Sequence, residues 1–152
     1  MNTHALRFDE NGLPIFGSIV DGVTYKKRPA AYVIVTRPEG RIAAVGAKGA
    51  YFLPGGGSLP GEPPEETVIR EVREELARSV EIISEIGRAV QYFFADEQHY
   101  RMQAVFFAAM FTSDATEVGE HQLLWLEPSE FARGAFHQCH AWAVRQTGEK
   151  SE

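Results

Sequence analysis

A short strand, a glycine-rich loop and an amphipathic helix follow one another within residues 51–78, and this succession constrains the fold most strongly. The apolar run at 51–53 predicts the strand, and the proline and three glycines at 54–57 predict a flexible loop. From residue 65 to about residue 78, apolar side chains recur with the period of an α-helix. We expect one apolar stripe to face the core, formed by Ile69, Val72 and Leu76.

Three glutamates occupy the face of this helix opposite the apolar stripe. Glu71, Glu74 and Glu75 are spaced i, i+3 and i+4, so their carboxylates lie within one turn. Each like-charge pair costs about 0.2–0.5 kcal/mol on a helix surface, and a hard divalent cation would remove that repulsion. The alternative is an ordinary solvated acidic face. The glycines just upstream, whose backbone can approach a metal or a phosphate closely, favour a site over that alternative.

Residues 56–78 match the sequence motif of a known family. Gly56 is followed after five residues by Glu62, and after seven more by the heptapeptide REVREEL at 70–76. In these residues and their spacing the segment resembles the box of the Nudix hydrolases. Two positions depart from the box, since Ala77 stands for the usual glycine and Arg78 for a hydrophobic residue. Ala77 predicts either about 1 kcal/mol of strain in a left-handed conformation or a helix that runs slightly further.

The resemblance implies an α/β fold, a Nudix-like α/β/α sandwich with a mixed β-sheet. We expect residues 1–152 to form a single domain, with residues 1–28 as an N-terminal strand or a loose arm. Further strands are expected at 30–36, 41–45, 85–94, 103–111 and 123–126, one helical turn at 128–131 and a helix at 136–146.

The resemblance also implies a hydrolase that depends on Mg²⁺ or Mn²⁺. Its substrate would be a nucleoside diphosphate linked to another group, and water would attack a phosphorus atom of the phosphoanhydride. Nucleoside triphosphates, dinucleoside polyphosphates, ADP-ribose and nucleotide sugars all fit this description. The alternatives are a catalytically silent nucleotide-binding or regulatory module and an enzyme of the same fold with other chemistry. The retention of every box glutamate favours an active hydrolase.

Individual metal ligands follow from the same resemblance. Glu74 and Glu75 are the first expected ligands of the cation. Glu71 is expected to be either a further ligand or the general base that receives the proton of the attacking water. The backbone carbonyl of Gly55 is expected to add one more oxygen.

Supporting residues are expected around these ligands. Arg70 and Glu62 would form an ion pair that orients the glutamates, the alternative being a surface salt bridge of small value. Relatives often supply another acid from a loop beyond the box, and Glu120 is the preferred candidate for a ligand or base, with Glu117 as the alternative. His121 follows this acid, although a lone loop histidine is more often exposed than catalytic.

Substrate contacts are expected from the loop and from an aromatic cluster. Lys48 precedes the loop, and Gly56 and Gly57 lie within it, so all three are candidate substrate-binding residues. Tyr92 begins the aromatic cluster 92–94, which either stacks on a base or fills the core. The remaining cations that suit phosphate contacts are Lys26, Lys27, Arg28, Arg37 and Arg101.

Two histidines near the C-terminus form a weaker pattern. His137 and His140 are spaced i and i+3, a spacing that can bind a transition metal. No carboxylate or cysteine pattern completes such a set, so we expect no metal site there.

Composition excludes several classes of partner. A net charge of −6 argues against a nucleic-acid polymer, and no apolar run approaches the ~20 residues of a membrane span. The single cysteine, Cys139, excludes an internal disulfide and, with no apparent signal peptide, suits a cytoplasmic protein. The expected partner is therefore a small nucleotide-type substrate, and a homodimer is a fair expectation for the oligomeric state.

Overall fold

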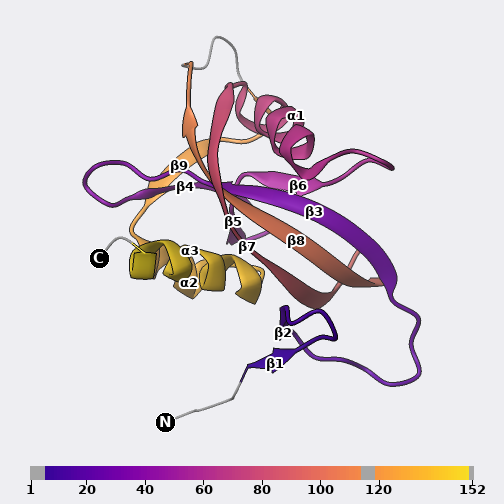
Figure 1. The fold of residues 1–152 in the computed structure, drawn as a ribbon. Coiled ribbons are helices and arrows are strands. Elements are labelled where there is room, and N and C mark those ends of the chain that lie inside the picture. The colour runs from indigo at the N-terminus through magenta and orange to yellow at the C-terminus, as the bar shows by residue number, and fades with distance from the viewer. Residues whose placement is uncertain (1–5, 114–118, 151–152) are drawn as a thin grey trace.

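Two β-sheets lie between one helix on one side and two on the other in the computed structural model, which describes residues 6–113 and 119–150 (Figure 1). The elements in chain order are β1 (Arg7–Phe8), β2 (Pro14–Phe16), β3 (Lys26–Ile34), β4 (Ile42–Ala47), β5 (Ala50–Phe52), β6 (Gly55–Gly57), α1 (Pro64–Leu76), β7 (Val80–Ala95), β8 (Gln98–Phe111), β9 (Leu123–Leu126), α2 (Pro128–Gly134) and α3 (Gln138–Lys150).

The larger sheet is mixed, as the sequence predicts. It has the strand order β1-β2-β7-β8-β3-β6, and the smaller sheet has the order β5-β4-β9. In the larger sheet β3 runs parallel to β8 and antiparallel to β6, and β2 runs parallel to β7. The smaller sheet is antiparallel throughout.

The second half of strand β3, residues 30–34, is buried on both faces, which explains its continuous apolar sequence. Tyr32 and Ile34 pack in the core cluster that includes residues of α2 and α3. Val33 and Val35 point the other way, into the core cluster that includes residues of α1. The strand therefore separates two cores, with α1 on one side of the sheet and α3 on the other (Figure 1).

Helix α1 buries a stripe that differs by one residue from the predicted one. Val68, Val72 and Leu76 are buried at a spacing of four residues, whereas Ile69 is 43% exposed. The prediction for Ile69 is wrong because Val68 and Ile69 both fit a helical stripe with Val72 and Leu76, and the helix turns Val68 inward. Of the two alternatives for Ala77, the left-handed one occurs, with φ 54° and its N–H bonded to the carbonyl of Arg73.

Several predicted boundaries need correction. The segment 54–57 is not wholly a flexible loop, because residues 55–57 pair with β3. Strands β7 and β8 are longer than predicted, and two irregularities in β7 explain why its first half does not alternate cleanly. The single turn expected at 128–131 is the two-turn helix α2, and α3 begins and ends later than the predicted 136–146.

The N-terminal segment contains strands rather than a wholly loose arm. β1 pairs with β2, and Ile15 and Phe16 of β2 pair with Val90 and Gln91 of β7. Gly17 follows with φ 88°, and an added Cβ there would collide with the carbonyl of Tyr92, so a glycine is required. Glu117 lies outside the described residues.

Candidate active site

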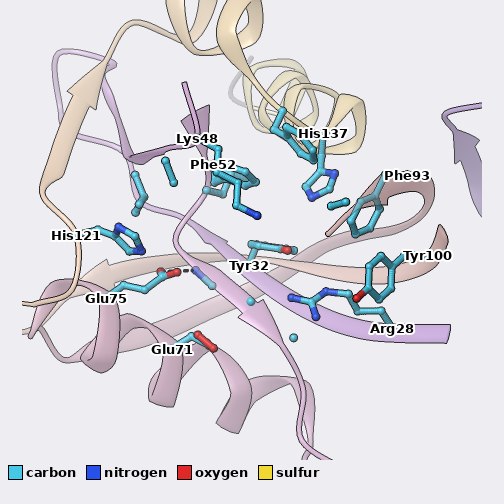
Figure 2. A pocket seen from close by; sticks show the side chains of 18 of the residues that line it. Arg28, Tyr32, Lys48, Phe52, Glu71, Glu75, Phe93, Tyr100, His121 and His137 are labelled. Atoms are coloured by element: carbon cyan, nitrogen blue, oxygen red, sulfur yellow. Dashed lines mark hydrogen bonds between the residues drawn. The ribbon is translucent and has the colours of Figure 1, made fainter. Parts of the chain in front are cut away.

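A cavity of about 350 Å³ opens where β6, α1, the β4–β5 turn and the start of α3 meet. Figure 2 shows its two different ends, with Glu71 and Glu75 of α1 at one end and His137 and Phe93 at the other. Tyr32 lies between these ends (Figure 2). The cavity can therefore receive a ligand that carries a charged group and an aromatic or apolar group at opposite ends.

The glycines of β6 make this arrangement sterically feasible. A Cβ at Gly56 would lie 2.9 Å from the Cδ atom of Glu71, and one at Gly57 would lie 3.0 Å from the Cζ atom of Arg28. At Gly55, with φ 140°, a Cβ would overlap the carbonyl of Ala31. Because successive residues of a strand point to opposite faces, β6 lies between Glu71 and Arg28.

The carboxylate of Glu75 is largely buried beside this strand. Its Oε1 atom accepts a hydrogen bond of 3.1 Å from the N–H of Gly55. Burial raises the pKa of Glu75 to about 8, and the charges of Glu71 and Glu120 act in the same direction against the Gly55 hydrogen bond. A bound cation would relieve both the burial cost and the repulsion.

The neighbouring carboxylate, Glu71, is in a similar but less buried environment. Burial raises its pKa, and the charges of Glu74 and Glu120 add to this effect against the attraction of Arg70. Two acids with raised pKa values at one end of a cavity are typical of a functional site.

Arg70 forms the network expected of a supporting residue. Its Nε and Nη2 atoms donate to both oxygens of Glu62, at 2.9 and 3.0 Å, and Nη2 also donates to the carbonyl of Gly57. Its Nη1 atom donates to Glu71 and Glu74 at 3.3 and 3.1 Å. One guanidinium thus connects β6, the following loop and two turns of α1.

The other member of this ion pair is held from several directions. Glu62 accepts from the N–H of Leu59 at 3.0 Å and from the hydroxyl of Thr67 at 2.8 Å. The hydrogen bonds from Arg70 and then from Leu59 lower the pKa of Glu62 to about 2. Glu62 therefore stays ionised and fixes the orientation of Arg70.

The structure brings most of the predicted site residues together at the cavity. Those that line it are Lys48, Gly55, Gly56, Gly57, Glu71 and Glu75. Glu74 is not among the lining residues; its side chain is 45% exposed and is bonded to Arg70.

The loop before β9 docks on the end of α1. The N–H groups of Glu120 and His121 donate to the carbonyls of Glu74 and Glu75, at 3.1 and 2.8 Å. The charge of Glu120 acts on both Glu71 and Glu75, yet His121, and not Glu120, lines the cavity beside Glu75 (Figure 2).

The aromatic end of the cavity uses a different residue from the one predicted. Phe93 lines the cavity, whereas its neighbour Tyr92 does not and instead packs edge-on against Tyr25 and accepts a hydrogen bond from Arg101. Sequence alone places the cluster 92–94 in a strand, but only the register of β7 decides which residue faces inward.

Further lining residues had no usable signal in the sequence. Phe52 ends β5, whereas Phe136 and His137 are consecutive residues between α2 and α3, and these two segments meet only in the folded chain. Arg28 also lines the cavity, although sequence reasoning did not distinguish it from the other cations. Lys48 is tied to Asp96 by an exposed ion pair of 3.6 Å between two hairpin turns.

The carboxylates suit a cation held partly by its substrate. Among residues 6–113 and 119–150, no group of three or more His, Cys, Asp or Glu side chains is assembled closely enough to hold a metal ion. Mg²⁺ commonly uses only one or two carboxylates and completes its shell with water and phosphate oxygens. Glu71 and Glu75 fit that requirement, since both are destabilised as free anions.

Comparisons with known proteins agree on one family. The family model described as the NUDIX domain matches residues 26–146. A putative 8-oxo-dGTP diphosphatase of Bacillus subtilis (strain 168) is 33% identical over 102 residues, which are 64% of this chain. The match spans 65% of that relative, slightly less than two thirds of its length.

Solved structures show the same fold. A NUDIX hydrolase from Nitrosomonas europaea has a TM-score of 0.69 at 14% identity, over 82% of this chain and 90% of that one. A MutT NUDIX hydrolase from Burkholderia pseudomallei has a TM-score of 0.64 at 25% identity, over 80% and 98%. The predicted α/β/α fold with a mixed sheet is confirmed. None of the described helices has the length and apolar character needed to cross a membrane.

Proposed function

Because the chain belongs to the NUDIX family, we propose that it is a divalent-metal-dependent hydrolase of a phosphoanhydride bond in a small nucleotide-type substrate. The observation that carries the proposal is the pair of partly buried carboxylates with raised pKa values, Glu71 and Glu75, at one end of a cavity whose other end is aromatic. We also propose a cytoplasmic location, which rests on the use of cysteine in the sequence.

Glu71 and Glu75 would hold Mg²⁺ or Mn²⁺, together with the carbonyl of Gly55. The cation would neutralise charge on the phosphate oxygens and lower the pKa of the attacking water. The charges of Glu74 and Glu120 raise the pKa values of both these acids. We propose that Glu74 and Glu120 complete the site when the cation and substrate are bound.

The protein's own residues would orient the reacting groups. Arg70, fixed by Glu62, holds Glu71 and Glu74 in place through hydrogen bonds that exist before any substrate arrives. A carboxylate of this cluster not engaged with the cation would accept the proton of the attacking water. Lys48 and the backbone of Gly56 and Gly57 would lie beside the phosphates.

The aromatic end would receive the base of the substrate. Phe52, Phe93 and Phe136 supply ring surfaces there, and stacking on such surfaces is favourable for any base. The name of the Bacillus subtilis relative makes 8-oxo-dGTP one substrate that deserves a direct test.

The proposal is tested with a panel of nucleotides. The protein is incubated with Mg²⁺, Mn²⁺ or a chelator, and with nucleoside triphosphates, 8-oxo-dGTP, a dinucleoside polyphosphate, ADP-ribose and a nucleotide sugar. We expect turnover on at least one, abolished by the chelator. Glu71→Gln and Glu75→Gln should each lower kcat by at least about 100-fold, whereas the exposed helix residue change Glu66→Gln should not.

The silent-module alternative makes the opposite prediction. A binding module would bind a nucleotide from the same panel without turnover, and neither glutamine variant would differ from the unmodified chain in hydrolysis. That result would contradict the hydrolase proposal while leaving the family assignment intact.

A further inference from the structure

One polar side chain at the aromatic end of the cavity has an unused hydrogen-bonding atom. His137 is only 4% exposed, and its Nδ1 atom is buried without a hydrogen-bond partner among the residues that the structure describes. Figure 2 shows the imidazole extending from the start of α3 into the cavity. A buried polar atom without a partner is unfavourable, and a ligand at this end of the cavity would supply one.

Three aromatic rings surround the imidazole of His137. Its ring lies 4.6 Å from that of Phe93, 4.8 Å from Phe136 and 5.7 Å from Phe52, in each case edge to face. Flat apolar faces with one polar atom among them are suited to hold a heteroaromatic ring and to read its edge.

The second buried histidine serves as an internal comparison. The Nδ1 atom of His140 accepts a hydrogen bond of 3.1 Å from the N–H of Leu53, and the ring packs edge-on against Tyr32 at 4.2 Å. Its Nε2 atom, like Nδ1 of His137, has no partner among the described residues. His140 is fully buried and does not line the cavity. His140 therefore has a structural role, and His137 is the histidine that a ligand can reach.

Arg28 brings hydrogen-bond donors to the same end of the cavity. Its guanidinium lies 5.9 Å from the ring centre of Tyr100, which stacks on Phe93 at 5.1 Å. It is on the opposite face of β6 from Glu71, and in the described part of the chain no carboxylate forms an ion pair with it. Its donors are thus available to a ligand.

We propose that His137 and Arg28 hydrogen-bond to the edge of the substrate base and select a 6-oxopurine, such as guanine, over adenine. This inference rests on the proposed function, because it assigns the base of the nucleotide to the aromatic end.

The preference for a 6-oxopurine follows from the hydrogen-bond donors and acceptors of the protein and of the base. Arg28 only donates, and guanine presents two acceptors, O6 and N7, on one edge. Adenine presents N7 and an amino donor there, so its amino group would face the donors of Arg28. Burial and the charge of Arg28 lower the pKa of His137 to about 4, so its imidazole is neutral at pH 7 and can both donate and accept.

The first experiment compares kcat/KM for dGTP, dITP and dATP. Inosine carries the same O6 and N7 edge as guanine but lacks the 2-amino group, so dITP should match dGTP, and both should exceed dATP by about 10- to 100-fold. His137→Phe, which keeps a flat ring, should remove most of this preference by lowering only the dGTP and dITP values. His137→Asn, whose amide occupies the position of Nδ1, should retain it.

Two outcomes would overturn the inference. An unchanged dGTP-to-dATP ratio in His137→Phe would show that His137 only fills the core. If Arg28→Met lowered all three values equally, Arg28 would contact the phosphates instead of the base. Thermal unfolding of each variant establishes that it is folded before its ratio is interpreted.

A second experiment does not depend on hydrolysis. The ring nitrogens of His137 are followed by NMR while dGMP or dAMP is added to the metal-free protein. We expect dGMP to shift the ring signals of His137, and dAMP to do so only at higher concentration. If no nucleotide were hydrolysed but dGMP still shifted these signals, the hydrolase proposal would fail and the base assignment would stand; no shift with either nucleotide would overturn the assignment.

Discussion

Glu75 links the protonation of the cavity to its affinity for a cation. Its pKa of about 8, raised by burial, means that a proton competes with the metal at neutral pH. In the metal-free protein this shift also lowers stability as the pH rises from 4.5 through 8, because the folded chain retains a proton that the unfolded chain releases.

We therefore expect Mg²⁺ affinity to rise about tenfold for each pH unit below 8 and to level off above it, as displacement of one proton requires. Calorimetric titration at pH 6.5, 7.5 and 8.5 measures this. Glu75→Gln should remove the dependence and Glu66→Gln should preserve it. A constant affinity between pH 6.5 and 8.5 in the unmodified protein would contradict the role of Glu75.

Ala77 is strained where the family box has a glycine. It adopts φ 54° at the end of α1, in a region that costs a residue with a Cβ roughly 1–2 kcal/mol. We expect Ala77→Gly to stabilise the protein by about 1 kcal/mol, measured by urea unfolding. Ala132→Gly, in the exposed face of α2, is the matched control and should destabilise it by about 0.5–1 kcal/mol.

The sequence predicts the acidic cluster well and the aromatic end poorly, because the acidic residues are close together in the sequence and the aromatic residues are far apart. Glu71 and Glu75 are one helical turn apart, so local periodicity is enough to bring them together. The raised pKa of Glu75 depends on its burial beside β6, and the inward position of Phe93 depends on the register of β7. Neither property is local.

Strand β6 consists only of glycine, and a Cβ atom at each of its three positions would meet a different neighbour. We expect Gly55→Ala to destabilise the protein by more than about 3 kcal/mol, because it adds overlap with the carbonyl of Ala31 to an unfavourable φ. Gly61→Ala, with positive φ but open space around it, should cost only about 1–2 kcal/mol. Chemical unfolding measures both, and equal losses would contradict the steric argument.

The elements missed from the sequence share a physical cause. β6 carries no side chains, so it has no hydrophobic period and resembles a loop until its pairing with β3 is known. The first half of β7 is interrupted by bulges, which break the alternation on which strand prediction depends. By contrast, β3 and α1 have strong local patterns and were predicted to within a few residues.

Two buried neutral histidines make a contribution to the stability of the whole molecule that is lost in acid, opposite in sign to the contribution of Glu75. The folded pKa of His137 is about 4 and that of His140 is also lowered, both mainly by burial, against an ordinary value near 6.5. The unfolded chain therefore protonates these histidines first, and their contribution to stability is lost as the pH falls from 6.5 to 4. His137 alone contributes about 3 kcal/mol to this loss.

The comparison that isolates this effect uses His137→Phe. The free energy of unfolding is measured by urea at pH 7.0 and pH 4.5 in both proteins. Relative to the unmodified protein, the variant should gain stability at pH 4.5 compared with pH 7.0, and an identical pH dependence in the two proteins would contradict the role of His137. Glu62, with a pKa near 2, contributes little to the change above pH 4.5.

At the level of the fold, the family motif predicted the α/β/α layers, but not the cavity. Its walls come from both sheets and from the start of α3, and they meet through the parallel pairing of β3 with β8 and the docking of the last helix. Such contacts join residues far apart in the chain and leave no short pattern in the sequence.

The thin glycine strand has a consequence for how such a protein can change. Bond breaking is assigned to α1 on one side of β6, and base selection to Arg28 of β3 and to His137, just before α3, on the other. Because no side chain of β6 connects the two sides, a substitution at the recognition side need not disturb the carboxylates. Such an enzyme can acquire a new substrate while its reaction stays the same, so the two properties are free to evolve separately.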